Sequence, residues 1–493
     1  MAVQFNRIPQ SGLRTPGYYG EINGAQTPYV SLQRLLLLGQ KLADGSAASG
    51  VPVQVIGDPD GLFGKNSMMA DEVKFARKNA PFQEIWALPM DDLAGGVKRV
   101  VTGTVAGGAL PVENAASFSF WIGDVRIRTS VYTTDTATTL AARIAAAINA
   151  ADRCPFTATS ALGVITITAR HKGTAPNSVV FDFDYYNDEG PLAATLLSFA
   201  NTTPGSGDPD FTDALDDLAD EPFRWIVGPY VDSTNLPAIQ TFLNDVSGRW
   251  SPIQQNYGQY VGIDAGSISA QQTLAALYNE PTTASFGTYK CASPSWVIAG
   301  ALGGRIAAHL SDAPELSRPL QTLELIGCLP PKLPADRPNI TTRNTLYFAG
   351  VGSYRVQGRT MQIDRVVTHY RANPWGVADA VWLDLETRAQ AMWSADGLRA
   401  AVLGQYGRAA LMDDNPDNLP GVATPRDIRN VLIHEYKRQH SLGVVEHPEL
   451  FSEALVVERS QQDATRVDCY IPEDVANQLR IVATNITIFL QRN

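Results

Sequence analysis

Apolar and polar residues alternate along the segment 480–490. One face of this segment carries four apolar residues, which are Val482, Ile486, Ile488 and Leu490. Thr484 interrupts that face, the opposite face is mixed, and β-branched residues dominate without any Gly or Pro, so the pattern predicts a strand. A long, uncharged, apolar strand is prone to aggregate unless it is paired. We therefore expect this strand to pair either inside its own sheet or with another chain.

The first 28 residues show no such regularity. This stretch contains Pro9, Gly12, Pro16, Gly17, Gly20 and Gly24, which exclude a long helix. Terminal segments are usually poorly ordered unless something holds them. Two long, non-helical ends indicate a subunit whose ends are held by neighbouring chains.

Between these ends, the chain first follows an alternation of strands and helices. A continuous apolar run at 32–39 is typical of a strand buried on both faces. The segments 51–56 and 84–88 predict two further strands, and the apolar spacing between them predicts a helix over 67–79 with Ser67 as its N-cap. This order predicts an α/β fold with a parallel sheet.

The alternation stops near residue 101. From there to residue 205 the pattern predicts short strands separated by turns, at 117–122, 124–131, 163–168 and 178–186, with one alanine-rich helix at 136–151. The α/β pattern resumes with a buried strand at 225–227. Residues 101–205 are therefore predicted to form a β-rich domain inserted into a loop of the α/β fold.

Composition limits the possible functions. A chain of 493 residues has room for roughly two to four domains. A net charge of -11 argues against nucleic-acid binding, because phosphate contacts need a basic face. No apolar run is long enough to span a membrane. The four cysteines, Cys154, Cys291, Cys328 and Cys469, form no CxxC pair, so we expect free, mostly buried thiols and a reducing compartment.

Candidate catalytic chemistry is sparse. No G-x-S-x-G motif places a serine on a sharp turn, and the six histidines show no metal-ligand spacing such as HExxH. Asp264, His309 and some later serine would follow the chain order of subtilisin, but no motif supports such a triad. We expect each histidine to be an ordinary surface or core residue.

Two further clusters have structural explanations. Gly300, Gly303 and Gly304 suggest a phosphate loop, but no Lys-Ser/Thr ending follows, and close packing of an apolar helix explains these glycines better. Acidic residues gather between Asp208 and Glu221, where they suit the solvated start of a helix. A metal site is the alternative for this acidic cluster.

Several motifs resemble one known family. FAGVGSYRV at 348–356, TMQIDRVVTHYR at 360–371 and DAVWLDLET at 379–387 are similar to the C-terminal domain of contractile tail sheath proteins, most closely those of Mu-like bacteriophages. RTPGYYGEIN at 14–23 and GLFG at 61–64 resemble the same family. The likeness spans nearly the whole chain, and 101–205 is its loosest part. Asn66 departs from the family pattern, because a glycine is expected there.

The resemblance implies a subtilisin-like α/β sheath domain with an inserted β-rich domain, and a C-terminal α+β domain with extended terminal arms. We accordingly divide the chain into five parts: an N-terminal arm (1–28), a discontinuous α/β domain (29–100 and 206–345), an outward-projecting insertion (101–205), an inner C-terminal domain (346–479) and a C-terminal strand arm (480–493). The α/β domain of the family resembles subtilisin without being a protease, which agrees with the missing catalytic motif.

The resemblance also implies a mechanical function, without enzymatic activity, metal or cofactor. Sheath subunits of this family stack as hexameric rings around an inner tail tube and contract to drive the tube through the host envelope. The implied partners are copies of the chain itself, the tail tube protein, and baseplate and tail terminator proteins, with no nucleic acid and no direct membrane insertion. The implied location is the virion tail, with the host cytoplasm during assembly. The alternative function is a cytoplasmic α/β hydrolase with an accessory β domain.

In relatives, the terminal arms of one subunit join the sheet of a neighbour's C-terminal domain by β-augmentation. Residues implied to anchor the two arms are Pro16, Tyr18, Tyr19 and Ile22 at the N-terminus and Val482, Ile486, Ile488 and Leu490 at the C-terminus. The implied receiving sheet includes Ile363, Val366, Val367 and Thr368, for which an ordinary core strand is the alternative. The helical segment 385–393 either packs its own domain or faces the tube.

Overall fold

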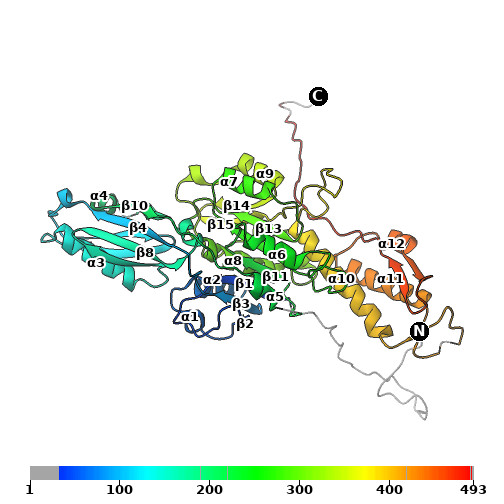
Figure 1. Ribbon diagram of the computed structural model, residues 1–493. Coiled ribbons are helices and arrows are strands. Elements are labelled where there is room, and N and C mark those ends of the chain that lie inside the picture. The colour runs from blue at the N-terminus through cyan, green and yellow to red at the C-terminus, as the bar shows by residue number, and fades with distance from the viewer. Residues whose placement is uncertain (1–32, 189, 219, 418, 489, 491–493) are drawn as a thin grey trace, which may run out of the picture. The chain divides into compact units, whose positions relative to one another are not determined.

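The computed structural model describes residues 33–188, 190–218, 220–417, 419–488 and 490 (Figure 1). The predicted N-terminal arm, with Pro16, Tyr18, Tyr19 and Ile22, lies outside the described residues. Among the residues described, no helix is both long and apolar enough to cross a bilayer.

An eight-stranded sheet forms the centre of the α/β domain, with the strand order β15-β14-β13-β12-β11-β1-β3-β2 (Figure 1). Its strands are β1 (Leu35–Gln40), β2 (Val53–Gln54), β3 (Ile85–Met90), β11 (Trp225–Gly228), β12 (Gln259–Asp264), β13 (Thr283–Gly287), β14 (Val351–Gln357) and β15 (Thr360–Arg365). Strands β3, β1, β11, β12, β13 and β14 run parallel, whereas β2 and β15 pair antiparallel at the two ends of the order. The predicted parallel sheet is confirmed, and every residue of β1 is buried. The strand predicted at 51–56 is shorter and contains only β2.

Helices pack around this sheet. They are α1 (Pro59–Phe63), α2 (Met68–Asn79), α5 (Thr212–Asp216), α6 (Asn235–Leu243), α7 (Ile268–Ala276), α8 (Ser295–His309) and α9 (Ile340–Ala349). The predicted cap of α2 is confirmed, because the Ser67 hydroxyl accepts a hydrogen bond from the Ala70 amide at 3.1 Å. Close packing of α8 is also confirmed, since a Cβ on Gly304 would lie 2.6 Å from the Ala76 carbonyl oxygen of α2. Asn66, where the family pattern expects glycine, has a φ of 63°, a left-handed conformation that asparagine tolerates.

The eight-stranded sheet continues past residue 345, where we placed the start of the C-terminal domain. Strand β14 pairs with β13, with Val351 opposite Ser285, and β15 extends the sheet by one more strand. Sheet membership depends on pairing between distant segments, which local patterns do not report. The chain leaves this sheet before Leu385, so the boundary at 345/346 lies inside the α/β fold.

The insertion contains two small antiparallel sheets. The first has the order β10-β4-β8-β7 and the second β6-β5-β9. Their strands are β4 (Lys98–Val105), β5 (Ala116–Ile122), β6 (Val125–Val131), β7 (Phe156–Ala161), β8 (Val164–Lys172), β9 (Phe181–Phe183) and β10 (Leu197–Thr203), and the helices are α3 (Ala137–Ala150) and α4 (Leu192–Leu196). A bridge between Val97 and Ser206 closes the base of the insertion. The predicted strands and helix are therefore present, although the strand predicted at 178–186 is reduced to β9.

The last part of the chain forms a separate small core. It contains α10 (Leu385–Tyr406), β16 (Ala410–Leu411), β17 (Val422–Ala423), α11 (Pro425–Ser441), α12 (Pro448–Ala454), β18 (Val456–Arg459) and β19 (Val467–Tyr470). Leu398, Leu432, Tyr436 and Phe451 are buried together in this core. In the segment 385–393, Leu385, Ala389 and Met392 are also buried, so this part of α10 packs the protein interior.

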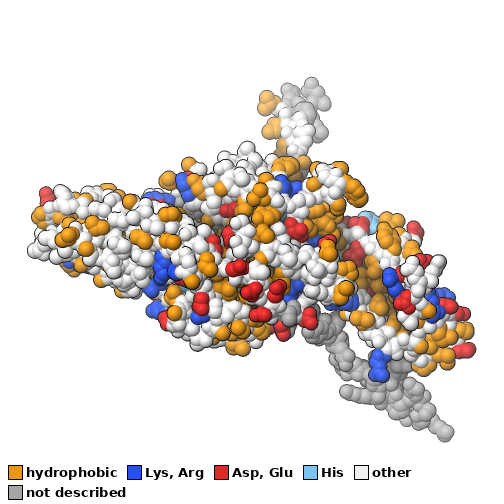
Figure 2. Space-filling view, in the orientation of Figure 1, with side chains coloured by type: hydrophobic (Ala, Val, Ile, Leu, Met, Phe, Trp, Pro, Cys, Tyr) orange, Lys and Arg blue, Asp and Glu red, His pale blue; other side chains and the backbone are white. Residues whose placement is uncertain are grey.

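The strand predicted at the C-terminus is not formed in the isolated chain. Residues 480–488 have no secondary structure, and no hydrogen bond joins 481–488 to the other described residues. Val482, Ile486 and Ile488 are 73%, 81% and 83% exposed, and apolar side chains are visible along this segment in Figure 2. A strand requires a partner for its backbone groups, and this chain supplies none among its described residues. Among the described residues, the strand is therefore not paired inside a sheet of its own chain.

Candidate functional site

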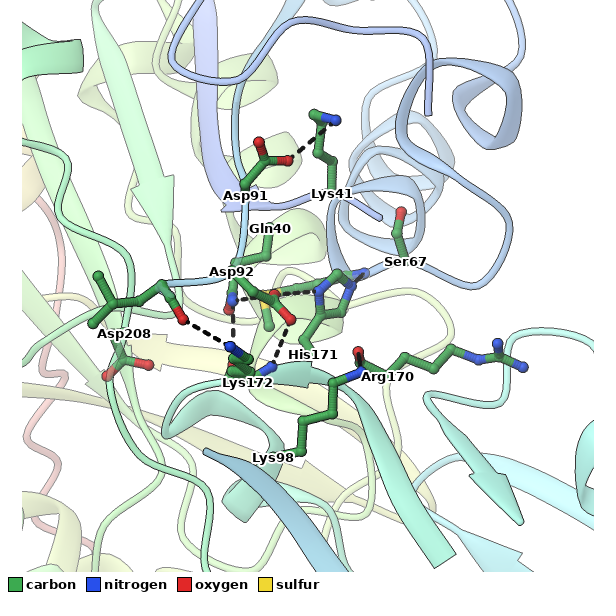
Figure 3. Close-up of polar contacts among 12 residues, drawn as sticks. Gln40, Lys41, Ser67, Asp91, Asp92, Lys98, Arg170, His171, Lys172 and Asp208 are labelled. Atoms are coloured by element: carbon green, nitrogen blue, oxygen red, sulfur yellow. Dashed lines mark hydrogen bonds and ion pairs between the residues drawn. The ribbon is translucent and has the colours of Figure 1, made fainter. Parts of the chain in front are cut away.

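The carboxyl ends of parallel strands are the usual ligand-binding edge of an α/β fold. Here the base of the insertion contacts that edge after β1 and β3 (Figure 3). The imidazole of His171, at the end of β8, lies with Nδ1 3.0 Å from the Asp92 carboxylate, and its Nε2 accepts a hydrogen bond of 3.0 Å from the Met68 amide. His171 and Ser67 are almost fully buried. The edge is therefore a contact between two parts of the fold.

This arrangement does not form a hydrolase triad. Because Nε2 of His171 accepts a hydrogen bond from the Met68 amide, Nε2 carries no proton, so Nδ1 carries the ring proton and donates to Asp92. Nε2 therefore has no free lone pair for a serine proton, and the Ser67 hydroxyl caps α2 by accepting from Ala70. His171 is a buried histidine, which is one of the two ordinary kinds, surface or core, that we expected for the histidines of this chain.

Asp92 receives several donors at this contact. Besides His171, its carboxylate accepts hydrogen bonds from the Lys172 amide at 3.0 Å and from Gln40 Nε2 at 2.7 Å. Burial opposes the ionisation of Asp92, but the hydrogen bonds from the His171 ring and the Lys172 amide outweigh burial and lower the pKa of this carboxyl. Gln40 Nε2 also donates to the Lys172 carbonyl at 3.1 Å, so one network joins β1, the end of β3 and β8.

A second contact, formed by ion pairs, holds the insertion to α2. Arg153 lies 2.8 Å from Asp124 and 3.5 Å from Asp71 of α2. Burial, partly offset by Arg153, raises the pKa of Asp71 to about 7. The Arg153 amide also donates to Asn66 Oδ1 at 2.8 Å. The insertion is thus bonded to the α/β domain at two places.

The remaining sequence candidates do not assemble into a catalytic site among the described residues. Asp264 accepts from the Gly266 amide at 2.8 Å, whereas the ring of His309 lies 3.8 Å from Glu315, and no hydrogen bond links Asp264 with His309. In the acidic cluster, Asp208 accepts from Thr174, and Asp210 accepts from the Thr212 amide at the start of α5. The part of the chain that is described holds one group of three potential metal ligands, the exposed Glu446, His447 and Asp474, which lies outside the acidic cluster.

The implied receiving residues are core residues in the structure. Ile363, Val366, Val367 and Thr368 are fully buried. The outer edge of β15 is occupied within the chain, because the Ile363 amide donates to Leu323 and the Thr368 amide donates to Leu383. These four residues therefore offer no free strand edge, and the alternative of an ordinary core strand describes them.

A free edge exists elsewhere, in the hairpin of β18 and β19. These strands pair only with each other among the described residues, from Val456 with Tyr470 to Arg459 with Val467. Beside β19 lies a groove of about 550 Å³ between the hairpin and helices α10 and α11. Its apolar lining includes Tyr257, Leu398, Val402, Ile428, Leu432, Val467 and Ile471. Gln255, Arg399 and Glu473 add polar groups to its lining.

Sequence reasoning missed this hairpin. Its signal is present, because the valines at 456–457 and the segment 467–471 flank a polar stretch that contains an Asp463-to-Thr465 turn. Such strands are short and carry charged residues such as Glu458 and Asp468, so their pattern is weak beside the long apolar runs of the α/β domain.

Comparisons with known proteins agree on one family. A family model described as the phage tail sheath protein central domain matches residues 205–369. Over 501 residues the chain is 32% identical to the Mu-like prophage FluMu tail sheath protein of Haemophilus influenzae. The alignment covers 99% of this chain and 100% of that protein.

Solved structures of low sequence identity are also similar. The sheath tail protein of Desulfitobacterium hafniense aligns with a TM-score of 0.48 and 11% identity, covering 94% of this chain and 97% of that chain. A chain in the baseplate of the anti-feeding prophage aligns with a TM-score of 0.47 and 12% identity, covering 97% and 100%. A sheath tail protein of Listeria innocua aligns with a TM-score of 0.48 and 11% identity, covering 91% and 93%.

Proposed function

This chain belongs to the phage tail sheath protein family, and from that premise we propose that it is the subunit of a contractile sheath whose neighbours are linked through their C-terminal arms. In this proposal, subunits stack as hexameric rings around an inner tail tube and contract to drive the tube through the host envelope. The tail tube protein and the baseplate and tail terminator proteins are the proposed partners. Assembly takes place in the host cytoplasm.

The exposed arm is the single observation that carries the proposal. Residues 481–488 alternate in the manner of a strand, but they make no hydrogen bond with the described residues and expose Ile481, Val482, Ile486 and Ile488 to solvent. Exposure of a β-prone apolar segment favours pairing with another chain. A second copy of the sheath subunit is the partner that a helical lattice always supplies.

The hairpin of β18 and β19 is the proposed receiver on the neighbour. Its backbone edges are free among the described residues, and Val467 and Ile471 already contribute to the adjacent groove. A strand added beside β19 would satisfy its own backbone groups and lay apolar side chains over Leu398 and Leu432 of the helices below. This replaces Ile363, Val366, Val367 and Thr368 as the proposed receiving sheet.

Contraction requires that some contacts change while others hold. We assign the changing contacts to the surfaces between α/β domains and the constant ones to the arm. Each subunit needs to gain only a few kcal/mol on contraction, because packed interfaces are bistable and many copies act together. The subtilisin-like character of the α/β domain and the outward position of the insertion remain predictions from the family resemblance.

Substitution of Ile486 by Asp tests the link. A carboxylate on the apolar face of an added strand would cost roughly several kcal/mol, since it would be buried without a partner. The matched control is Asn485→Asp, which adds the same charge one residue away on the opposite face. We expect Ile486→Asp subunits to fold normally by circular dichroism but to form no striated cylinders by negative-stain microscopy. Normal cylinders from Ile486→Asp would show that this arm is not the link.

A further inference from the structure

The eight residues before the exposed arm are bound along helix α10. We call this segment, 473–480, the strap. The Ser394 hydroxyl donates to the Glu473 carboxylate at 2.8 Å, Gln390 Nε2 donates to the Ala476 carbonyl at 2.8 Å, and Arg480 lies 2.8 Å from the Glu386 carboxylate. The strap therefore follows α10 toward the start of the helix, one contact after another.

The three helix residues that hold the strap share one face. Glu386, Gln390 and Ser394 are spaced by four residues, which aligns them along one side of a helix, and all three are fully buried. Further bonds reinforce the middle of the strap, because Gln478 Nε2 donates to Gln390 Oε1 at 3.0 Å. Polar side chains at fixed intervals in a buried face specify one position for the strap along α10.

Arg480 closes this series at a junction of two parts of the fold. Its guanidinium contacts Asp384 at 3.1 Å as well as Glu386. Asp384 is also held by Arg365, the last residue of β15, through two hydrogen bonds of 2.8 Å. Arg480 is thereby connected both to the first turn of α10 and to the end strand of the eight-stranded sheet.

Among the described residues, Arg480 makes the last hydrogen bonds between the C-terminal segment and the rest of the chain. Arg480 has 15% of its side chain exposed, whereas the next residue, Ile481, is 83% exposed. A pull applied to the arm by a neighbouring subunit would therefore reach Arg480 before any other contact of the strap.

We propose that Arg480 is the anchor of the C-terminal arm, and that it passes tension from a neighbouring subunit into both α10 and the eight-stranded sheet. This proposal rests on the proposed exchange of arms between subunits. The guanidinium suits this role because it binds Asp384 and Glu386 together in a partly buried site, where charge-assisted hydrogen bonds are strong.

Replacement of Arg480 by Met tests the anchor, with Arg318→Met as the control. Arg318 forms an exposed ion pair with Glu315 at 2.6 Å, and its side chain makes no hydrogen bond to the strap residues 473–480. In the soluble subunit, we expect Arg480→Met to speed hydrogen exchange in the strap by about tenfold or more, because the strap opens locally from its end. Arg480→Lys, which keeps one charge, should restore part of the protection. We expect no change in the strap of Arg318→Met.

Assembled sheaths test the transfer of tension. Arg480→Met sheaths should form, because the apolar arm is intact, but should break into shorter fragments than wild-type sheaths under the same shear, as measured by electron microscopy. If hydrogen exchange in the strap is the same in Arg480→Met as in the wild type, Arg480 is not the anchor. If Arg480→Met and wild-type sheaths break into fragments of equal length, Arg480 does not carry tension. If subunits do not exchange arms at all, the result is different, because Ile486→Asp subunits would then assemble. Hydrogen exchange in the strap of Arg480→Met would still report on the anchor in that case.

Discussion

Gly300 of α8 packs directly against the backbone carbonyl of Glu72 in α2, and a Cβ at position 300 would collide with that carbonyl oxygen. Both partners of this contact are backbone atoms of helices, so neither can rotate away. The contact lets α8 lie close enough to α2 for both helices to share the apolar core with β1 and β11. The glycine cluster at 300–304 is therefore a packing feature of the α/β domain.

Replacement of Gly300 by Ala should destabilise the subunit by roughly 1–3 kcal/mol or more, because the two helices must separate to admit the methyl group. Gly404→Ala is the matched control, since Gly404 also lies in a helix but a Cβ there would meet nothing within 4 Å. That control should gain about 0.5–1 kcal/mol from helix propensity. Thermal and urea unfolding of the soluble subunit would measure both changes. Equal stabilities for the two variants would contradict the packing explanation.

Glu72 makes the same region sensitive to pH. Its side chain is fully buried, and neither carboxyl oxygen has a hydrogen-bond partner among the described residues, so burial raises its pKa well above 4.5. As pH rises past 4.5, the unfolded chain loses this proton while the folded chain keeps it, so the free energy of unfolding decreases until the pH reaches the folded-state pKa. The loss amounts to about 1.4 kcal/mol per pH unit within that window.

Glu72→Gln should remove this dependence, because the amide does not ionise. We expect the free energy of unfolding of the variant to decrease less steeply than that of the wild type between pH 5 and the folded-state pKa, measured by urea titration at several pH values. Glu453→Gln, an exposed change in α12, should leave the slope as it is in the wild type. Parallel curves for the wild type and Glu72→Gln would mean that the buried carboxyl keeps its charge.

Local patterns predicted the parts of the fold that local forces determine. Ser67 caps α2 because its hydroxyl accepts a hydrogen bond from an amide three residues away. The glycines near residue 300 lie in an apolar helix, where their small size allows close packing against a neighbouring helix. Pairing of β14 with β13, in contrast, joins residues more than sixty positions apart, and nothing around Val351 shows that it belongs to the large sheet. The same limit explains why the receiving residues were expected at a free strand edge. The local sequence around Ile363 is the same whether the edge of its strand is free or covered by another segment.

The exposed arm shows a different limit of sequence reasoning. Alternation at 482–490 predicts a segment that is able to form a strand, but a strand exists only where a partner is present. The sequence therefore indicates the capacity of Ile486 to pair and leaves the partner open. Likewise, the break in the strand-helix pattern at 101–205 predicts an inserted domain. The position of His171 at the carboxyl edge of the α/β sheet depends instead on three distant segments that meet only in the folded chain.

Cys469 provides a direct test of where the arm binds. Of the four cysteines, Cys154, Cys291 and Cys328 are buried, and Cys469 on β19 is exposed. A strand added beside β19 would bring one of its residues opposite Cys469, with Cβ atoms about 4.5–5.5 Å apart, a separation that small movements reduce to disulfide distance. Cysteine substitutions at Val482, Thr484, Ile486 and Ile488, made one at a time, would sample the possible registers of that pairing.

One or two of these four substitutions should give covalent chains of subunits after mild oxidation of assembled sheaths, seen as a ladder on non-reducing gels. The four positions lie on one face of an added strand, so a single register places one of them opposite Cys469 and its same-face neighbours about 7–8 Å away, which predicts strong cross-linking at one position and little at the others. Adding Cys469→Ser to the reactive variant should abolish the ladder, because the three buried thiols cannot be reached. A ladder that persists without Cys469 would place the arm on another surface, and equal cross-linking at all four positions would mean that the arm only collides with the hairpin and does not pair with it.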